Sequence, residues 1–270
     1  LPAREVKTLF EIINKLRKRG VTILYISHRL DEIFLMADQV TVLRDGNLIG
    51  TVKPGDITQD ELVQMMIGRK PAERQYWKPE RKERLKNAPV VLEVENLRDG
   101  ANLKDVSLQV SQGEILGIAG LVGSGNSEVL QCIFGAKKAV GGRVKIKGKE
   151  IKSFEPANLI KNSLGFLPSD RKHLGLILGM SIKRNISLTG LEELSKFFVV
   201  KNQQENQVVD RLAKKLKIKS SNLEQLVETL SGGNQQKVVM AKWLLPECKI
   251  LMFDEPTRGI DVGARSEIYE

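Results

Sequence analysis

The stretch from Leu230 to Asp261, LSGGNQQKVVMAKWLLPECKILMFDEPTRGID, joins a Ser-Gly-Gly helix start to an apolar strand that ends in two carboxylates. Its segment Ser231 to Gly233 leaves backbone N–H groups unpaired at the start of a helix that is predicted to run to about Leu244. Such a helix end attracts phosphate, because its free N–H groups and the helix dipole both favour an anion. The first half of the stretch therefore predicts an anion-binding helix start.

The second half of the stretch predicts a buried strand with acidic residues at its end. Ile250 to Phe253 are four apolar residues in a row, the pattern of a strand buried on both faces of a parallel sheet. Ligand sites of open α/β sheets gather at the carboxyl ends of the strands. Asp254 is then placed to hold Mg²⁺ through water, and Glu255 to polarise an attacking water in phosphoryl transfer. A capped helix followed by a core strand with an acidic turn is the alternative without a ligand, and the joint occurrence of both halves disfavours it.

These motifs resemble those of the ATP-binding cassette (ABC) family. LSGG looks like the family signature, FDEP like its Walker B segment, and Gly259 to Asp261 like its D-loop. The resemblance implies a glycine-rich phosphate loop upstream, and GLVGSGNSE occupies Gly120 to Glu128. This loop follows the apolar run Ile115 to Ala119, a predicted strand, and precedes the helical pattern Val129 to Phe134. That is the strand, loop and helix context of a P-loop.

The loop departs from GxxxxGK[ST] at Asn126, which stands in the lysine position. Its backbone N–H groups could still form a nest for phosphate, and Ser127 keeps the hydroxyl that would touch Mg²⁺. What is missing is the ammonium that would pair with the β and γ phosphates, a charge-assisted contact of roughly 1.5–3 kcal/mol. We therefore expect this site to bind nucleotide weakly or to hydrolyse it slowly; a glycine-rich turn without a ligand is the alternative.

Two further departures concern the same half of the chain. In GFLPSDR, which starts at Gly165, Ser169 occupies the place of the family's Q-loop glutamine and is too short to replace it. An aromatic residue for adenine stacking is not evident near Asn96 to Gly100. Because Glu255 is retained, the resemblance implies a site that lacks some of the family's contacts but keeps this carboxylate.

The amino-terminal part resembles the tail of another cassette. YISHRLDE follows an apolar run and puts His28 at the switch-histidine position; a surface or capping histidine is the alternative. The periodicities predict a helix up to Gly20, a strand Val21 to Ile26, a short helix to Ala37, and strands Val40 to Leu43 and Leu48 to Val52 around the turn Asp45-Gly46.

Motif order sets the expected domains, since a cassette has its P-loop first and its histidine last. Residues 1–68 are expected to be the end of a first nucleotide-binding domain, 69–89 a charged linker, and 90–270 a second nucleotide-binding domain. We expect an α/β fold of the ABC type of P-loop NTPase, truncated at both ends. It would have a parallel core sheet, an antiparallel β flank at Val91 to Val94, Asp105 to Val110 and Val144 to Ile146, and a helical subdomain that includes Gln207 to Leu216.

Composition agrees with a soluble α/β protein: 270 residues are 41% hydrophobic, 28% charged and 5% aromatic. No apolar run approaches the ~18 residues of a membrane span, and Cys132 and Cys248 lack metal spacing. The net charge of +10 is concentrated in the proline-punctuated linker, which is read as a tether. Contact of the linker with anionic lipid or nucleic acid is the alternative, and two aromatics, Tyr76 and Trp77, are too few for a base-stacking surface.

Four stretches of the chain together resemble the ATP-binding subunits of bacterial monosaccharide importers. They are LSGGNQQKV, DEPTRGIDVGAR, GEILGIAGLVGSG and YISHRLDEIF. Subunits of that group consist of two cassettes fused in one polypeptide. The resemblance implies ATP and Mg²⁺ as cofactors and hydrolysis that drives sugar uptake through a separate permease, for which Ser181 to Leu188 is the expected neighbour. It also implies an external sugar-binding protein, a peripheral position on the cytoplasmic face of the membrane, and no nucleic acid. Alternatives are a double cassette that remodels ribosomes and a non-catalytic regulatory module.

The resemblance also assigns roles residue by residue. Glu255 and His28 are the expected catalytic residues, and Ser127 and Asp254 the expected Mg²⁺ ligands. The two domains would close head to tail, so that the signature of this half covers nucleotide on the other. The expected nucleotide contacts are Gly120, Gly123, Ser124, Gly125, Asn126, Ser127, Glu128, Ser231, Gly232, Gly233, Asn234 and Asp261.

Overall fold

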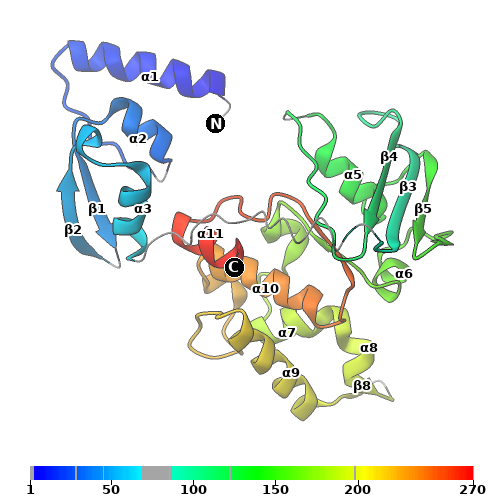
Figure 1. The fold of residues 1–270 in the computed structure, drawn as a ribbon. Coiled ribbons are helices and arrows are strands. Elements are labelled where there is room, and N and C mark those ends of the chain that lie inside the picture. Colours follow the sequence, from blue (N-terminus) through cyan, green and yellow to red (C-terminus); the bar gives the residue numbers. More distant parts are fainter. Residues whose placement is uncertain are drawn as a thin grey trace. The chain divides into compact units, whose positions relative to one another are not determined.

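The structure is a computed structural model that describes residues 3–27, 29–44, 46–68, 85, 87–121, 123–197 and 199–269 (Figure 1). The chain divides into two compact units: residues 1–74 together with 261–270, and residues 75–260. Most of the predicted linker 69–89 lies outside the described residues. Among the described helices, none combines the length and the apolar composition needed to cross a bilayer.

The first unit is built on a hairpin and a capped helix. Strands β1 (Val40–Arg44) and β2 (Asn47–Val52) pair antiparallel, and α3 (Gln59–Ile67) packs on both. Thr58 and Glu61 form a capping box at the start of α3, which satisfies two otherwise free N–H groups. The unit also contains α1, α2, a short turn of helix and α11, with the bounds Ala3–Lys18, Leu30–Met36, Pro54–Asp56 (η1) and Val262–Tyr269.

The predicted strand Val21 to Ile26 is wrong. These residues form no strand, and Leu24 and Ile26 are 92% and 91% exposed. A strand exists through its ladder of hydrogen bonds to a neighbour, and no described segment supplies that ladder here. The predicted helices on either side and the hairpin are confirmed.

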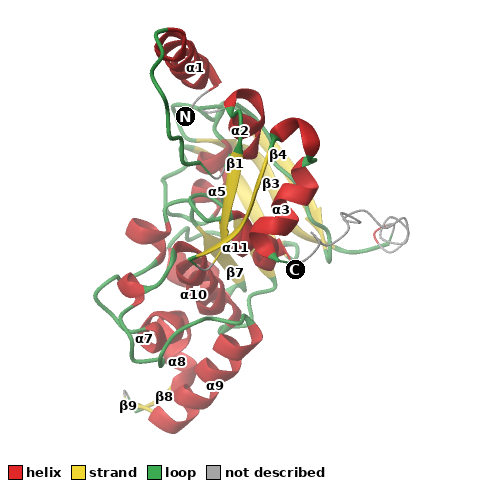
Figure 2. Ribbon diagram, turned by 90° about the vertical axis from the view of Figure 1, so that its left-hand side faces the viewer, coloured by secondary structure: helices red, strands yellow, loops and turns green. Residues whose placement is uncertain are grey.

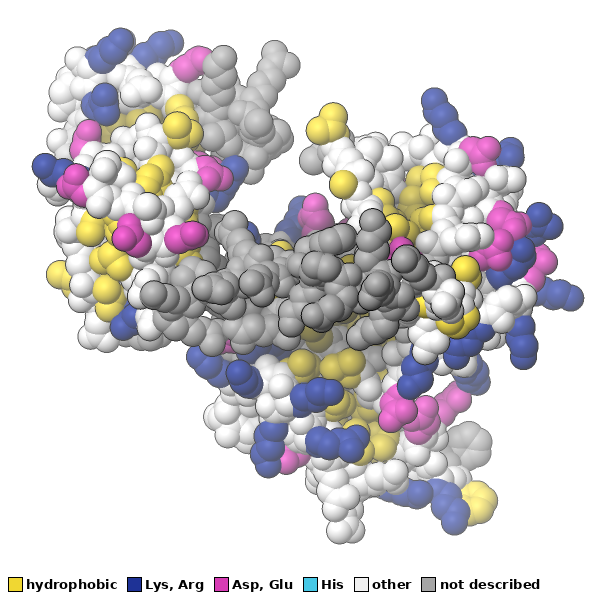
Figure 3. All heavy atoms as spheres, viewed as in Figure 1, with side chains coloured by type: hydrophobic (Ala, Val, Ile, Leu, Met, Phe, Trp, Pro, Cys, Tyr) yellow, Lys and Arg dark blue, Asp and Glu magenta, His cyan; other side chains and the backbone are white. Residues whose placement is uncertain are grey.

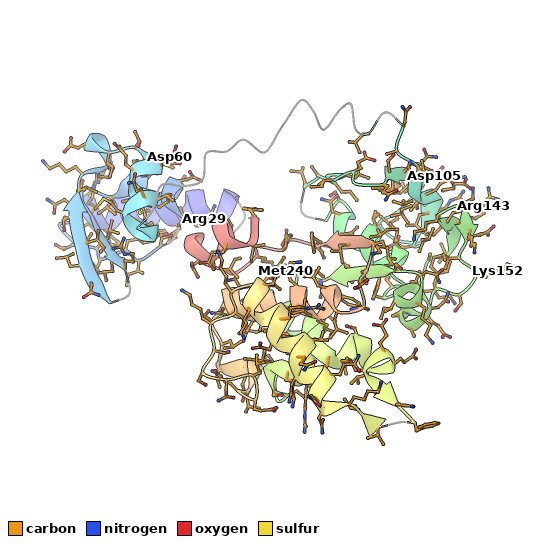
Figure 4. All side chains as sticks on the ribbon, turned by 60° about the horizontal axis from the view of Figure 1, so that its bottom comes forward. Arg29, Asp60, Asp105, Arg143, Lys152 and Met240 are labelled. Atoms are coloured by element: carbon orange, nitrogen blue, oxygen red, sulfur yellow. The ribbon has the colours of Figure 1, made fainter. Side chains whose placement is uncertain are left out.

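The second unit begins with an antiparallel sheet, which confirms the predicted β flank. Its strand order is β4-β3-β5-β6, with β3 in the middle, paired with β4 on one side and β5 on the other. Arg143, labelled in Figure 4, extends from β5 and pairs with Glu95 of β3 at 2.9 Å. The strands are β3 (Val90–Arg98), β4 (Val106–Ser111), β5 (Gly141–Ile146) and β6 (Lys149–Glu150).

A parallel pair of strands carries the acidic edge of this unit. Strand β10 (Ile250–Phe253) has the predicted bounds and pairs parallel with β7 (Leu164–Leu167), with Ile250 opposite Leu164. Figure 2 labels β7. All four residues of β7 are buried, as a strand inside an α/β layer requires. Two helices precede β7 in the chain, α5 (Asn126–Ile133) and α6 (Pro156–Lys161), and α6 contacts β7.

The predicted strand Ile115 to Ala119 is wrong as well. The segment belongs to no strand, and Ile115, Leu116 and Ile118 are 76%, 41% and 40% exposed. Its apolar composition suits a strand, but within the described residues the parallel sheet consists of β7 and β10 alone, so no neighbour pairs with this segment.

Helices form the remainder of the second unit and confirm the predicted helical subdomain. Helix α10 (Gly232–Leu244) contacts α7, α9 and β7; Figure 4 labels its Met240. Lysine and arginine side chains are numerous on the surface of these helices (Figure 3). The other elements are η2 (Arg171–Gly175), α7 (Ile182–Ser187), η3 (Leu188–Gly190), α8 (Leu191–Leu194), β8 (Ser195–Lys196), β9 (Val199–Val200), α9 (Asn202–Lys215) and η4 (Val227–Thr229).

Candidate functional site

The P-loop bends through two glycines that adopt left-handed backbone conformations. Gly123 has φ +85° and Gly125 has φ +97°, values that favour glycine because it lacks a Cβ. A Cβ on Gly125 would also lie 2.8 Å from Cδ2 of Leu103. The chain then enters α5 directly, with Gly125 as its N-cap, so the loop delivers the helix start that a phosphate site needs.

Asn126 occupies space inside this loop. The Ser124 hydroxyl donates to Oδ1 of Asn126 at 3.2 Å, and a Cβ on Gly120 would lie 2.9 Å from the same Oδ1. The amide therefore lies across the loop, close to the backbone of Gly120. A neutral amide supplies no charge for a phosphate group, so this loop depends on its backbone N–H groups to hold an anion.

The loop before the P-loop is held by a buried carboxylate. Asp99 accepts hydrogen bonds from the backbone N–H groups of Ala101 (2.9 Å) and Leu103 (2.7 Å) and from Nζ of Lys137 (2.7 Å). The Lys137 ammonium, followed by the two amides, holds the pKa of Asp99 well below its usual range. This network fixes Leu103 against Gly125.

Glu128 stands in the first turn of α5 and accepts a hydrogen bond from Nδ2 of Asn102 at 2.9 Å. A carboxylate in the first turn stabilises a helix through its dipole. The same negative charge stands near the loop that would receive phosphate, which weakens the attraction for an anion.

Ser127 and Asp254 come together from opposite parts of the second unit. The Ser127 hydroxyl donates to Oδ1 of Asp254 at 2.9 Å, and the N–H of Asp254 continues the β10 ladder by bonding to the carbonyl of Leu167 at 2.9 Å. Asp254 is 5% exposed, and its Oδ2 is buried without a hydrogen-bond partner among the described residues. A buried carboxylate oxygen in that state is costly unless a cation or donor satisfies it.

The next residue, Glu255, faces solvent. It has a positive φ of 43°, uncommon for a residue with a side chain. Its carboxylate lies 3.5 Å from Arg258, and both side chains are more than 60% exposed. Glu255 is therefore accessible to water at the end of β10.

The signature segment lies at the surface of the same unit. Ser231, the N-cap of α10, is exposed, and its hydroxyl accepts a hydrogen bond from Nδ2 of Asn234 at 3.0 Å. Oδ1 of Asn234 in turn accepts from the N–H of Lys219 at 2.8 Å. The start of α10 is thus shaped by Asn234, while the Ser231 side chain remains open to solvent.

The rest of the NQQK extension is buried, which its polar composition does not predict. Gln235, Gln236 and Lys237 are 3%, 3% and 4% exposed. Nε2 of Gln235 donates to the carbonyl of Val227 at 3.2 Å, and Nζ of Lys237 donates to that of Lys217 at 3.0 Å. These side chains fasten the segment that precedes the signature onto α10.

The sequence also gave no signal for Arg171, whose guanidinium donates to the carbonyls of Arg258 (2.7 Å) and Gly259 (3.1 Å). Its partners lie almost ninety positions away, so only the pairing of β7 with β10 brings them together. The site residues of this unit therefore form two clusters. One joins the P-loop to Asp254, and the other joins Arg171, the start of α10 and the turn after β10.

Two predicted residues are not among the described residues of the second unit. Asp261 belongs to the first unit, where its Oδ1 accepts from the N–H of Ala264 at 2.8 Å. His28 lies outside the described residues. In the first unit, Glu32 accepts from the Tyr25 hydroxyl at 2.6 Å and pairs with Arg29 at 2.6 Å; Figure 4 labels Arg29.

No group of three or more His, Cys, Asp or Glu side chains that could hold a metal ion occurs in the described part of the chain. The oxygen atoms of Ser127 and Asp254 would therefore need phosphate and water to complete a coordination shell, which is the way Mg²⁺ commonly binds. His173 is exposed, and its Nδ1 lies 2.8 Å from Oδ2 of Asp170.

Comparison with known proteins places these features in a family. Residues 103–258 match the family described as "ABC transporter". The chain is 45% identical over 269 residues to the ribose import ATP-binding protein RbsA of Bacillus cereus, covering all of this chain and 53% of the relative. It is 44% identical over 267 residues to a putative ribose/galactose/methyl galactoside import ATP-binding protein of Albidiferax ferrireducens, with 98% and 52% covered. The chain thus spans about half the length of the curated relatives it matches.

Solved structures show the same fold. A nucleotide-free ATP-binding cassette from an ABC transporter matches with a TM-score of 0.55 and 26% identity, covering 67% of this chain and 74% of that one. A dimeric cassette in a post-hydrolysis state, bound to ADP and Pi, matches with a TM-score of 0.56 at 23% identity, over 66% of this chain and 79% of that one. These likenesses confirm the predicted P-loop NTPase fold of the ABC type.

Proposed function

We propose that this chain, because it belongs to the ABC transporter family, supplies ATP-binding and energy-coupling parts of an importer for a simple sugar. The observation that supports this most directly is the 2.9 Å hydrogen bond between Ser127 and Asp254. It joins the P-loop to the acidic end of β10, where nucleotide sites of α/β sheets lie. The sugar class comes from the relatives named as ribose or galactose import proteins.

ATP with Mg²⁺ is the proposed cofactor pair. The Ser127 hydroxyl and the buried, unpartnered Oδ2 of Asp254 are hard oxygen donors of the type that Mg²⁺ prefers. When bound, Mg²⁺ would neutralise charge on the phosphates. Glu255, open to solvent at the end of β10, would orient and polarise the attacking water.

The proposed mechanism uses two cassettes in one polypeptide. Residues 1–68 and 90–270 would belong to different nucleotide-binding domains that close head to tail. The start of α10, with Ser231 to Gly233, would cover ATP held by the other domain, and His28 and Asp261 would act at that same nucleotide. ATP hydrolysis would drive sugar through a separate membrane permease, with the protein peripheral on the cytoplasmic face and an external binding protein delivering the sugar.

A second candidate is that the nucleotide site of this half is regulatory and does not turn over. It is favoured by Asn126, whose neutral amide lies across the P-loop. In that case the P-loop of residues 120–128 would hold nucleotide without hydrolysing it, while the signature of the same unit would serve the other site. Both candidates share the covering role of Ser231.

Replacing Ser231 by arginine in the complete transporter tests the proposal. Ser231 is exposed at the start of α10, so Ser231→Arg should leave folding intact and abolish sugar uptake by blocking closure over nucleotide. Glu228→Arg, which puts the same side chain on an exposed position of η4, is the matched control and should transport normally. Uptake by Ser231→Arg at the wild-type rate would refute the assignment.

A further inference from the structure

The Arg171 side chain links the turn after β10 to the start of α10, two segments that the proposed function assigns to the same nucleotide. Its Nη1 donates to the carbonyl of Arg258 at 2.7 Å and its Nη2 to the carbonyl of Gly259 at 3.1 Å. These carbonyls are consecutive, so one planar guanidinium holds one turn by two bonds. A fork of this kind fixes orientation as well as distance.

The same guanidinium lies against the start of α10. A Cβ on Gly232 would lie 2.6 Å from Nη2 of Arg171 and 3.1 Å from the carbonyl oxygen of Gly259. Only a residue without a side chain leaves this space for the guanidinium. The third signature position, Gly232, therefore forms one wall of the Arg171 site, and the turn at residues 258–259 forms the other.

Stabilisation of the helix does not account for an arginine in this place. The start of a helix carries partial positive charge, so a cation beside Gly232 is unfavourable for α10 itself. Burial adds to that cost and lowers the pKa of Arg171 below its ordinary value. The two carbonyl oxygens of the turn at 258–259 offset both costs. Binding this turn therefore explains why a charged side chain stands beside the start of α10.

Arg171 is itself held in place by its own turn. Asp170 accepts hydrogen bonds from the N–H groups of Lys172 (3.2 Å) and His173 (3.1 Å), which caps η2. At the other end of η2, a Cβ on Gly175 would lie 3.2 Å from Val239 of α10. The guanidinium therefore extends from a fixed base.

We propose that Arg171 is a positioning residue that locks the turn at 258–259 to the start of α10. This inference rests on the proposed function. When the signature closes over nucleotide on the other cassette, the turn that leads to Asp261 would then move with it as one body. Arg171 would affect the rate of the closed state's chemistry without touching nucleotide.

The test compares Arg171→Lys with Lys172→Met. Lysine keeps the charge but cannot donate to two carbonyls from one plane, whereas Lys172 is the exposed neighbour on the same turn. In the complete transporter, Arg171→Lys should lower kcat for ATP about tenfold and leave KM within about twofold, because the lost contact acts after binding. Lys172→Met should match the wild type. Wild-type kcat in Arg171→Lys, or a raised KM with unchanged kcat, would overturn the proposal.

Two measurements on the present chain need no activity. Amide hydrogen exchange across residues 256–260 should become about tenfold faster in Arg171→Lys, while the Tm stays within about 2 °C. In the wild-type chain, the guanidinium should give separate Nη signals in ¹⁵N-edited NMR, because both of its ends are bonded. Unchanged exchange in folded Arg171→Lys would overturn the clamp. One averaged Nη signal in the wild-type chain would also overturn it, and that readout does not require the variant to fold. Normal sugar uptake by Ser231→Arg would instead overturn the proposed function. It would not change the hydrogen-exchange or NMR results expected for Arg171.

Discussion

Ser127 donates its hydroxyl hydrogen to Asp254 across a separation of 127 residues, at 2.9 Å. This bond leaves the second carboxylate oxygen of Asp254 buried without a partner among the described residues. The pair thus combines one satisfied and one available oxygen at the end of β10. An available oxygen of this kind is where a divalent cation between protein and phosphate would gain most.

Asp254→Asn should remove the effect of Mg²⁺ on nucleotide affinity. The amide can still accept from Ser127, but it lacks the negative charge that a divalent cation needs. Titration of a fluorescent ATP analogue with Mg²⁺ and with EDTA measures the difference. Asp210→Asn, an exposed carboxylate on α9 that pairs with Lys214, is the control and should respond to Mg²⁺ as the wild type does. A full Mg²⁺ response in Asp254→Asn would exclude Asp254 as a ligand.

Asn126→Lys should tighten nucleotide binding by the P-loop. The ammonium adds a charge-assisted contact to phosphate of roughly 1.5–3 kcal/mol, which corresponds to about tenfold to a hundredfold in Kd. The same titration measures it. Asn126→Ala clears the amide from the loop without adding charge and should gain far less. If both variants tighten binding equally, the amide obstructs the loop and the missing charge is unimportant.

Asp99→Asn should lower the Tm by roughly 5 °C near neutral pH, because the variant leaves Lys137 without its ion pair beside the P-loop. The folded-state pKa of Asp99 is lowered by Lys137 and by the amides of Ala101 and Leu103. Its contribution to stability is therefore fully present above the unfolded pKa of about 3.9 and is lost as the pH falls toward the folded pKa. Thermal melts between pH 7 and pH 2 should show the two proteins converging in acid. A constant difference in Tm would contradict this assignment.

Cys248 should react slowly with thiol reagents in the folded protein. Burial raises its pKa to about 11, so the thiolate is a small fraction at pH 8 and the reaction should be more than about a hundredfold slower than for an exposed cysteine. The rate should rise about tenfold per pH unit up to that pKa. Because the folded pKa is raised, the stability from the neutral thiol is present below the unfolded pKa and is lost as the pH climbs toward 11. Mass spectrometry of the labelled peptide measures the rate, and rapid labelling at pH 8 would contradict the burial.

The sequence predicted those elements whose pattern and local signals agree. Ile250 to Phe253 forms β10 with the predicted bounds, and the helix after Ser231 ends at Leu244. A continuous apolar run ending in charged residues and a Ser-Gly-Gly start each specify their element locally. That Ser127 and Asp254 act at one site was implied by the family resemblance alone, because periodicity does not say which distant segments lie together.

The remainder depends on neighbours that a local pattern does not contain. Val21 to Ile26 and Ile115 to Ala119 have strand composition, yet neither is a strand, since composition supplies no ladder partner. The sequence pattern assigns no role to Arg171, and its contacts appear only when β7 and β10 lie side by side. The burial of Gln235 and Gln236 was hidden in the same way, because it depends on the elements that pack around α10. The partner of Gln235, for example, is the main-chain carbonyl of Val227.

The apolar side chains left uncovered along Val21 to Ile26 and Ile115 to Leu121 affect how the chain behaves in concentrated solution. Leu24, Ile26, Ile115 and Leu121 are each more than 70% exposed. Segments rich in β-branched and aliphatic residues that lack a ladder are templates for pairing with other molecules. Purified alone, this chain is therefore expected to self-associate as its concentration rises. Low ionic strength, which leaves the net charge of +10 unscreened, or a capping strand should keep it dispersed.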